Sequence, residues 1–192
     1  MRGHIYTIPM LLTIIRLCSP FIMPVLILCL WELPYVTPHL VLVGCFLLLS
    51  VTDIFDGYLA RKFGEVTKLG QLLDPIADKF LIISSFMALF AVGAIGFAWV
   101  LILILREVFV MAVRYIACEH ENVLPISRLS KVKSVLQSLF ILFLLSPFGL
   151  ADGIITQSVY IVLLVATLGC SLYAAYEYYM QCIDILFRTY DF

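Results

Sequence analysis

Long apolar stretches separated by short polar breaks constrain this chain more than any other feature. A helix needs about 20 predominantly apolar residues to cross the hydrocarbon core of a bilayer. Hydrophobic residues make up 64% of the 192-residue sequence, which is well above the average for soluble domains. Six stretches meet the length requirement, roughly at residues 8–31, 38–60, 72–93, 97–118, 132–148 and 154–180. The sequence therefore predicts an all-α polytopic membrane protein with six transmembrane helices in a single domain over residues 1–192.

The positions of lysine and arginine predict the orientation of these helices. Basic residues lie before the first stretch, after the second, after the fourth and at the C-terminus, whereas the other three breaks contain none. Cytoplasmic loops carry an excess of Lys and Arg. We therefore expect both termini in the cytoplasm, and the cytoplasmic (inner) membrane as the location if the protein is bacterial. The formal net charge of −1 offers no electrostatic attraction for nucleic acid.

Four aspartates stand out against this apolar background. Asp53 and Asp56 are three residues apart near the end of the second stretch, and Asp74 and Asp78 are four apart at the start of the third. Side chains at these spacings share one face of a helix. Because a short cytoplasmic turn joins the two stretches, we expect a helical hairpin that gathers the four carboxylates just inside the membrane.

Four carboxylates in a low-dielectric setting require neutralisation. Oxygen ligands suit hard divalent cations such as Mg²⁺, Mn²⁺ or Ca²⁺ rather than zinc, and a pair of such ions favours displacement at phosphorus. In a purely structural interpretation, the aspartates would cap helices, and Gly57 and Ala60 would allow two helices to pack closely. It does not explain four acids at helical spacing with no matching set of bases, so the sequence favours a metal site.

The stretch as a whole reads D-x2-D-G-x2-A-R-x8-G-x3-D-x3-D from residue 53 to residue 78. It resembles the signature of the CDP-alcohol phosphatidyltransferase family at all eight fixed positions. The resemblance implies an enzyme that cleaves the pyrophosphate of CDP-diacylglycerol, releases CMP and joins the phosphatidyl group to a second alcohol. It also implies a homodimer surrounded by membrane lipid.

The resemblance assigns roles within this signature. Asp53, Asp56 and Asp74 would hold two Mg²⁺ or Mn²⁺ ions. Asp78 would share the ions and act as the general base toward the acceptor hydroxyl. Which carboxylate bridges both ions stays open. The residues assigned to the cytidine nucleotide are Asp53, Gly57, Ala60, Arg61, Gly70 and Asp74.

Three further stretches, at 7–17, 105–114 and 130–138, resemble the phosphatidylglycerophosphate synthases within that family. Thr7 and Met10 depart from the Asn and Thr that are typical of the first stretch. The similarity covers about residues 8–138 and implies sn-glycerol 3-phosphate as the acceptor. A small anionic acceptor needs fixed positive charge. The residues expected to supply it are Arg106, Arg114, Lys131 and Lys133.

Other interpretations stay open at this point. Lys131 and Lys133 would serve equally well as membrane-surface anchors, and Arg106 as half of a buried pair with Glu107. Inositol phosphate, serine or phosphatidylglycerol, the last giving cardiolipin, are alternative acceptors. A divalent-cation transporter and an intramembrane prenyltransferase are alternative classes. Both are disfavoured. A transporter requires acidic residues near the bilayer midplane, whereas the aspartates here are expected at the cytoplasmic boundary. Prenyltransferases have two separate Asp-rich motifs, whereas this chain has one linked motif.

Two residue classes receive structural interpretations. The six cysteines lack C-x-x-C or zinc spacing and are expected to be small buried hydrophobic residues. Tryptophans and tyrosines near the ends of the stretches, Tyr178 among them, are typical of an interfacial belt.

Overall fold

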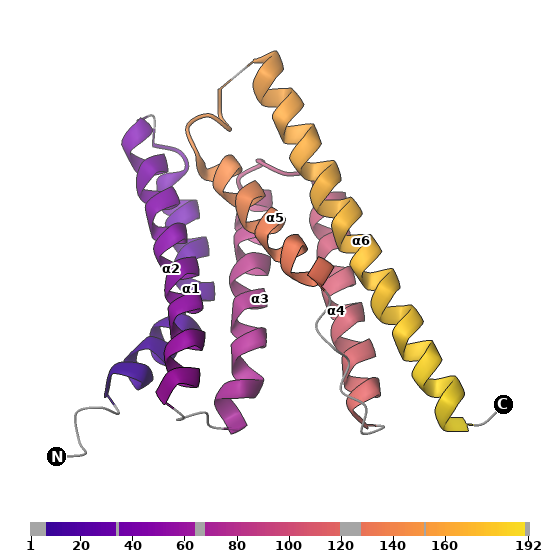
Figure 1. Ribbon diagram of the computed structural model, residues 1–192. Coiled ribbons are helices and arrows are strands. Elements are labelled where there is room, and N and C mark those ends of the chain that lie inside the picture. Colours follow the sequence, from indigo (N-terminus) through magenta and orange to yellow (C-terminus); the bar gives the residue numbers. More distant parts are fainter. Residues whose placement is uncertain (1–6, 34, 64–67, 120–127, 152, 191–192) are drawn as a thin grey trace. The chain divides into compact units, whose positions relative to one another are not determined.

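Six helices make up the computed structural model over the residues that it describes, which are 7–33, 35–63, 68–119, 128–151 and 153–190, and no strand occurs among them (Figure 1). Side chains are described for residues 18–33, 35–51, 79–113, 132–151 and 153–183. The helices are α1 (Thr7–Leu30), α2 (Val36–Phe63), α3 (Lys68–Ala91), α4 (Phe97–Glu119), α5 (Arg128–Leu145) and α6 (Ile154–Tyr190). Each predicted stretch corresponds to one helix, so the all-α prediction is confirmed.

The break between α3 and α4 is a defined helix stop, although it is only five residues long. Gly93 has a φ of 78°, a left-handed conformation that glycine adopts without steric cost. Its amide donates to the Phe90 carbonyl at 2.9 Å, and the Ala94 amide donates to the Leu89 carbonyl at 2.9 Å. This pair of bonds is the Schellman arrangement, which satisfies the last carbonyls of a helix. Two separate helices follow from it.

The chain forms two compact units, and the first comprises Met1–Ile95 with Ile141–Ala151. In this unit α1 packs against both α2 and α3. The fully buried side chains of its core include Met23, Ile27, Leu42, Phe46 and Leu89. The chain runs along α2 and returns along α3 in the opposite direction (Figure 1), as the hairpin prediction requires.

The second unit comprises Gly96–Phe140 with Asp152–Phe192, and in it α4 packs against α6. Its core includes Val110, Val113, Ala175, Tyr178 and Cys182. Tyr178 is only 1% exposed, so the interfacial-belt interpretation is wrong for this residue. Closeness to a helix end indicates membrane depth but not helix face, and Tyr178 shares a buried face with Ala175 and Cys182 at helical spacing.

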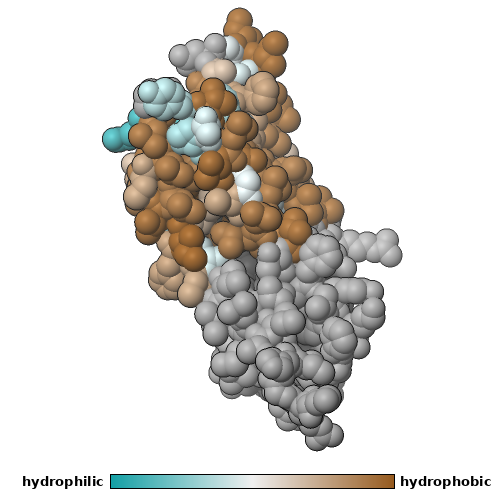
Figure 2. All heavy atoms as spheres, turned by 90° about the vertical axis from the view of Figure 1, so that its left-hand side faces the viewer, coloured by the Kyte–Doolittle hydropathy of each residue, from teal (hydrophilic) through white to brown (hydrophobic). Residues whose placement is uncertain are grey.

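Each of the six helices exposes large apolar side chains in the part whose side chains the structure describes. Large hydrophobic side chains that are more than half exposed include Phe21, Leu48, Phe80, Leu105, Val135 and Val162, one from each helix. The face drawn in Figure 2 is mostly brown wherever it is coloured. Apolar surface of this extent requires lipid or a protein partner. Residues Ile154–Ile183 of α6 are long and apolar enough to cross a membrane, and the other apolar segments with described side chains are shorter.

Four of the five cysteines with described side chains are at least partly exposed. Cys18 and Cys29 are exposed, Cys45 and Cys170 are partly exposed, and Cys182 is buried. The expectation of burial is therefore wrong for Cys18 and Cys29. Lipid tails are as apolar as a protein core, so a small hydrophobic side chain on a membrane helix gains little by facing inward.

Candidate functional site

The helical backbone carries both aspartate pairs. Asp53 and Asp56 lie in the second half of α2, and Asp74 and Asp78 lie in the first half of α3. The spacings of three and four are therefore helical spacings, and both pairs belong to the ends of α2 and α3 that residues 64–67 connect. The side chains of residues 52–78 lie outside the described part of the chain. The metal and nucleotide assignments for this stretch, including Gly57, Ala60, Arg61 and Gly70, stay predictions.

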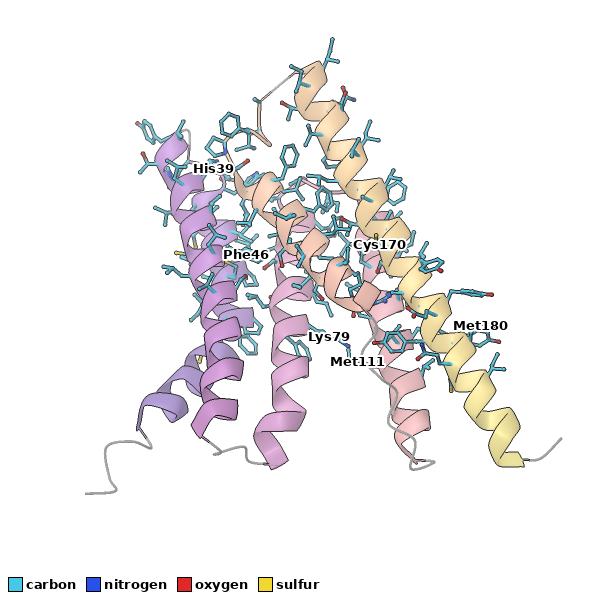
Figure 3. The ribbon with its side chains drawn as sticks, viewed as in Figure 1. His39, Phe46, Lys79, Met111, Cys170 and Met180 are labelled. Carbon is cyan, nitrogen blue, oxygen red and sulfur yellow. The ribbon has the colours of Figure 1, made fainter. Side chains whose placement is uncertain are left out.

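A cluster of charged side chains lies in the interior of the second unit. Arg106 and Glu107 come from α4 and Lys133 comes from α5, and their exposed fractions are 5%, 4% and 3%. Ser171 of α6, which is 1% exposed, borders the same cluster. Figure 3 labels two residues close to this cluster in the sequence. Met111 lies one turn after Glu107 in α4, and Cys170 precedes Ser171 in α6.

One oxygen of Glu107 joins the two cations. Arg106 Nη1 donates to Glu107 Oε1 at 3.0 Å, and Lys133 Nζ donates to the same Oε1. Arg106 Nε donates to the backbone carbonyl oxygen of Ser171 at 2.7 Å. Three helices therefore contribute to one hydrogen-bonded network that is buried from solvent.

The sequence alone does not produce this arrangement. Adjacent residues on a helix point in different directions and do not face each other, so Arg106 reaches Glu107 only by folding its long side chain across the helix surface. The Ser171 carbonyl fixes that conformation because it binds Nε while Nη1 turns toward the carboxylate. Packing of α6 on α4 thus aligns two residues that neighbour each other in the chain.

Two positive side chains of the cluster contact the same carboxylate, because Arg106 Nη1 and Lys133 Nζ both donate to Glu107 Oε1. Arg106 Nη2 and Ser171 Oγ are buried and have no hydrogen-bond partner among the described residues. Buried polar atoms without partners are rare in native proteins and call for an explanation such as a ligand.

These contacts bear on the sequence-based assignments for the basic residues. The buried pair of Arg106 with Glu107, named as an alternative, is present. Lys133 is buried in the cluster rather than exposed at a surface, so it is not a surface anchor within this unit. Arg114 lies in α4 and Lys131 in α5, with side chains outside the described part. The Ser171 carbonyl was not predicted, because a backbone acceptor leaves no sequence signal.

The comparisons with known proteins extend over most of the chain. A sequence model of the family described as CDP-alcohol phosphatidyltransferase matches residues 6–173. The CDP-diacylglycerol–glycerol-3-phosphate 3-phosphatidyltransferase of Rickettsia felis is 36% identical over 139 residues, which cover 71% of this chain and 76% of that protein. The protein of the same name from Wigglesworthia glossinidia brevipalpis is 34% identical over 144 residues, 72% of this chain and 76% of the relative.

A third relative, the protein of that name from Pectobacterium atrosepticum, is 32% identical over 164 residues, which cover 81% of this chain and 86% of its own length. The family match ends at residue 173, which lies within α6. The expected extent of similarity, to about residue 138, was therefore too short. The turn of α6 that carries Ser171 belongs to the matched region.

Proposed function

This chain belongs to the CDP-alcohol phosphatidyltransferase family, and on that premise we propose that it makes phosphatidylglycerophosphate. It is a phospholipid-biosynthetic transferase that moves the phosphatidyl group of CDP-diacylglycerol to sn-glycerol 3-phosphate and releases CMP. The observation that carries this proposal is the shared name of relatives that are 32–36% identical and cover at least 71% of the chain. The signature over residues 53–78 supports it independently.

The signature on α2 and α3 would bind the donor and the metal. Its donor set fits a pair of Mg²⁺ or Mn²⁺ ions by chemistry, because it offers four carboxylates and no soft ligand. We assign Asp53, Asp56, Asp74 and Asp78 to these ions. When bound, the ions would offset the negative charge of the pyrophosphate. The residues placed beside the cytidine nucleotide are Asp53, Gly57, Ala60, Arg61, Gly70 and Asp74.

Asp78 would act on the acceptor. Its carboxylate accepts the proton of the glycerol 3-phosphate hydroxyl as the hydroxyl oxygen attacks the β-phosphorus. The bond between the β-phosphorus and the bridging oxygen breaks, and CMP leaves with that electron pair. A positioned base of this kind contributes on the order of a hundredfold to ten-thousandfold to a rate.

The basic residues of α4 and α5 would bind the phosphate of the acceptor. Arg106 and Lys133 lie in a buried cluster with Glu107, and Arg106 Nη2 has no hydrogen-bond partner among the described residues. A phosphate offers the charged acceptor oxygens that a guanidinium N–H group binds most strongly. Arg114 and Lys131 are assigned to the same pocket from sequence. Serine and other acceptors without a phosphate satisfy this cluster less well.

The membrane arrangement follows from helix length and charge. At 1.5 Å per residue, the 24 residues of α1 and of α3 extend about 36 Å and the 18 residues of α5 about 27 Å, which is above or close to the hydrocarbon thickness of about 30 Å. We infer six membrane crossings in one catalytic domain, with both termini and the active site on the cytoplasmic side. The exposed apolar surface supports contact with lipid, and a homodimer is expected from the family.

Transfer itself tests this proposal. Purified protein in detergent receives CDP-diacylglycerol, Mg²⁺ or Mn²⁺, and one candidate acceptor at a time, and CMP release is measured. Release with glycerol 3-phosphate alone supports the proposal. Release with phosphatidylglycerol or inositol phosphate would keep the family and change the acceptor. Absence of release with every acceptor, together with transport of divalent cations into proteoliposomes, would overturn it.

A further inference from the structure

We propose that the hydroxyl of Ser171 is part of the acceptor site, where it and Arg106 Nη2 donate hydrogen bonds to one oxygen of the acceptor phosphate. The inference rests on the proposed function, because it concerns the acceptor of that reaction. Ser171 lies in α6 and Arg106 in α4, and both belong to the second unit. The signature over residues 53–78 lies in α2 and α3, so it assigns no role to this hydroxyl.

Ser171 Oγ and Arg106 Nη2 are buried polar atoms for which the described part of the chain supplies no hydrogen-bond partner. The exposed fractions of the two residues are 1% and 5%. Nearly all buried polar groups in native proteins have a partner, because burying a polar group without one is costly. Two such atoms in one place therefore indicate a ligand that brings an acceptor oxygen.

The two atoms lie beside each other because of the way in which Arg106 is held. The Nε–H group and one N–H group of Nη2 form the same edge of the planar guanidinium. On this edge Nε donates to the Ser171 carbonyl at 2.7 Å, so Ser171 is the residue next to Nη2. A second oxygen cannot pair with the whole edge while Nε is occupied. A single oxygen atom can still bind to Nη2, and the hydroxyl of Ser171 is the nearest additional donor for it.

Two other hydroxyls of α6 show that Ser171 differs from its neighbours. Thr167 Oγ1, one turn earlier, donates to the Leu163 carbonyl at 2.6 Å, and Ser158 Oγ donates to the Ile154 carbonyl at 2.8 Å. Serine and threonine side chains within helices commonly bond to the carbonyl four residues earlier in this way. Ser171 Oγ does not make this local bond, so its donor is left for another group.

A phosphate oxygen suits these two donors better than a neutral group does. Hydrogen bonds to an ionised oxygen are about twice as strong as those between neutral groups, and a low local dielectric strengthens them. The serine hydroxyl can rotate to donate toward the same oxygen as Nη2. The expected affinity comes from these hydrogen bonds and requires no excess of positive charge in the cluster.

Ser171→Ala tests this role, because it removes the hydroxyl and keeps the backbone carbonyl that accepts from Arg106 Nε. The experiment measures KM for glycerol 3-phosphate, KM for CDP-diacylglycerol and kcat in wild type and in the variant. We expect KM for the acceptor to rise about tenfold, as for the loss of one hydrogen bond to a charged group. We expect kcat and KM for the donor to stay within about twofold, because the contact is already made when the acceptor binds.

Thermal unfolding supplies a second measurement that does not depend on turnover. Removing a buried hydroxyl that has no partner should not destabilise the ligand-free protein, so Ser171→Ala should have the wild-type Tm or a higher one. Glycerol 3-phosphate should raise the Tm of wild type more than that of the variant, whereas glycerol, which lacks the phosphate, should affect both equally. The matched control is Thr167→Val, which removes a buried hydroxyl that is bonded within its own helix. We expect the wild-type acceptor KM for it.

The outcomes separate this inference from the proposed function. If wild type uses glycerol 3-phosphate and Ser171→Ala keeps the wild-type KM for it, the role of Ser171 is wrong and the function stands. A lower Tm of the ligand-free variant together with equal rises in both KM values would make the hydroxyl structural and also overturn the inference. Should wild type prefer another acceptor that carries a phosphate, the same comparison with that acceptor decides the role of Ser171. Activity only with acceptors that lack a phosphate, or none with any acceptor, would overturn both.

Discussion

Variants of the buried cluster test whether its contribution to stability comes mainly from charge or from the number of hydrogen bonds. Three single variants, Glu107→Gln, Arg106→Met and Lys133→Met, each remove one charge from it. Arg106 and Glu107 each take part in two of its hydrogen bonds, and glutamine retains a carbonyl oxygen that can accept from both cations. Counting hydrogen bonds therefore predicts that Glu107→Gln is milder than Arg106→Met. Counting charge predicts the opposite.

The magnitudes follow from what each variant leaves behind. Glu107→Gln removes the carboxylate charge that both cations contact, and breaking a buried pair in this way costs about 3–5 kcal/mol. Arg106→Met removes bonds of 2.7 and 3.0 Å but leaves Glu107 and Lys133 as a neutral pair. We expect a cost of about 1.5–3 kcal/mol from the hydrogen bonds to charged groups. Lys133→Met leaves the Arg106 pair intact and should cost least.

Thermal unfolding in one detergent at one scan rate measures this order. A difference of about 2 kcal/mol corresponds to about 4–8 °C in Tm for a chain of this size. Glu107→Gln should therefore unfold several degrees below Arg106→Met, and adding Lys133→Met to Glu107→Gln should raise the Tm again. If Glu107→Gln is as stable as Arg106→Met or more so, or if the second substitution lowers the Tm further, the charge argument is refuted.

Three further predictions concern the catalytic aspartate, the metal and a turn. Asp78→Asn should lower CMP release at least a hundredfold without loss of folded protein, while the exposed Glu32→Gln retains activity. Removing divalent ions with EDTA should abolish CMP release, and Mg²⁺ or Mn²⁺ should restore it while Zn²⁺ does not. Gly149→Ala should lower stability by about 1–3 kcal/mol, because its Cβ would lie 2.3 Å from the Phe143 carbonyl oxygen. Gly169→Ala, which has open space around its Cβ, should be neutral or slightly stabilising in the same thermal unfolding assay.

The number and order of the helices could be predicted because a bilayer imposes a minimum apolar length. The ends were less predictable. The fifth stretch was expected to reach residue 148, but α5 ends at Leu145, where Ser146 Oγ donates to the Phe143 carbonyl and the Gly149 amide donates to the Ser146 carbonyl. The sixth was expected to end at 180, but α6 continues to Tyr190. Hydropathy registers the part of a helix within the membrane, whereas backbone hydrogen bonds continue beyond it.

The two halves of the candidate site differ in how much the sequence specifies. The sequence spacing of the aspartates is sufficient for this prediction, because residues three or four apart lie on the same face of a helix. The basic cluster carries no such pattern, because Lys133 is 26 residues from Glu107 and Ser171 is 65 residues from Arg106. Arg106 and Glu107 are in contact although adjacent residues on a helix normally point in different directions. The carbonyl of Ser171, on another helix, accepts from Arg106 Nε and fixes the conformation of this side chain.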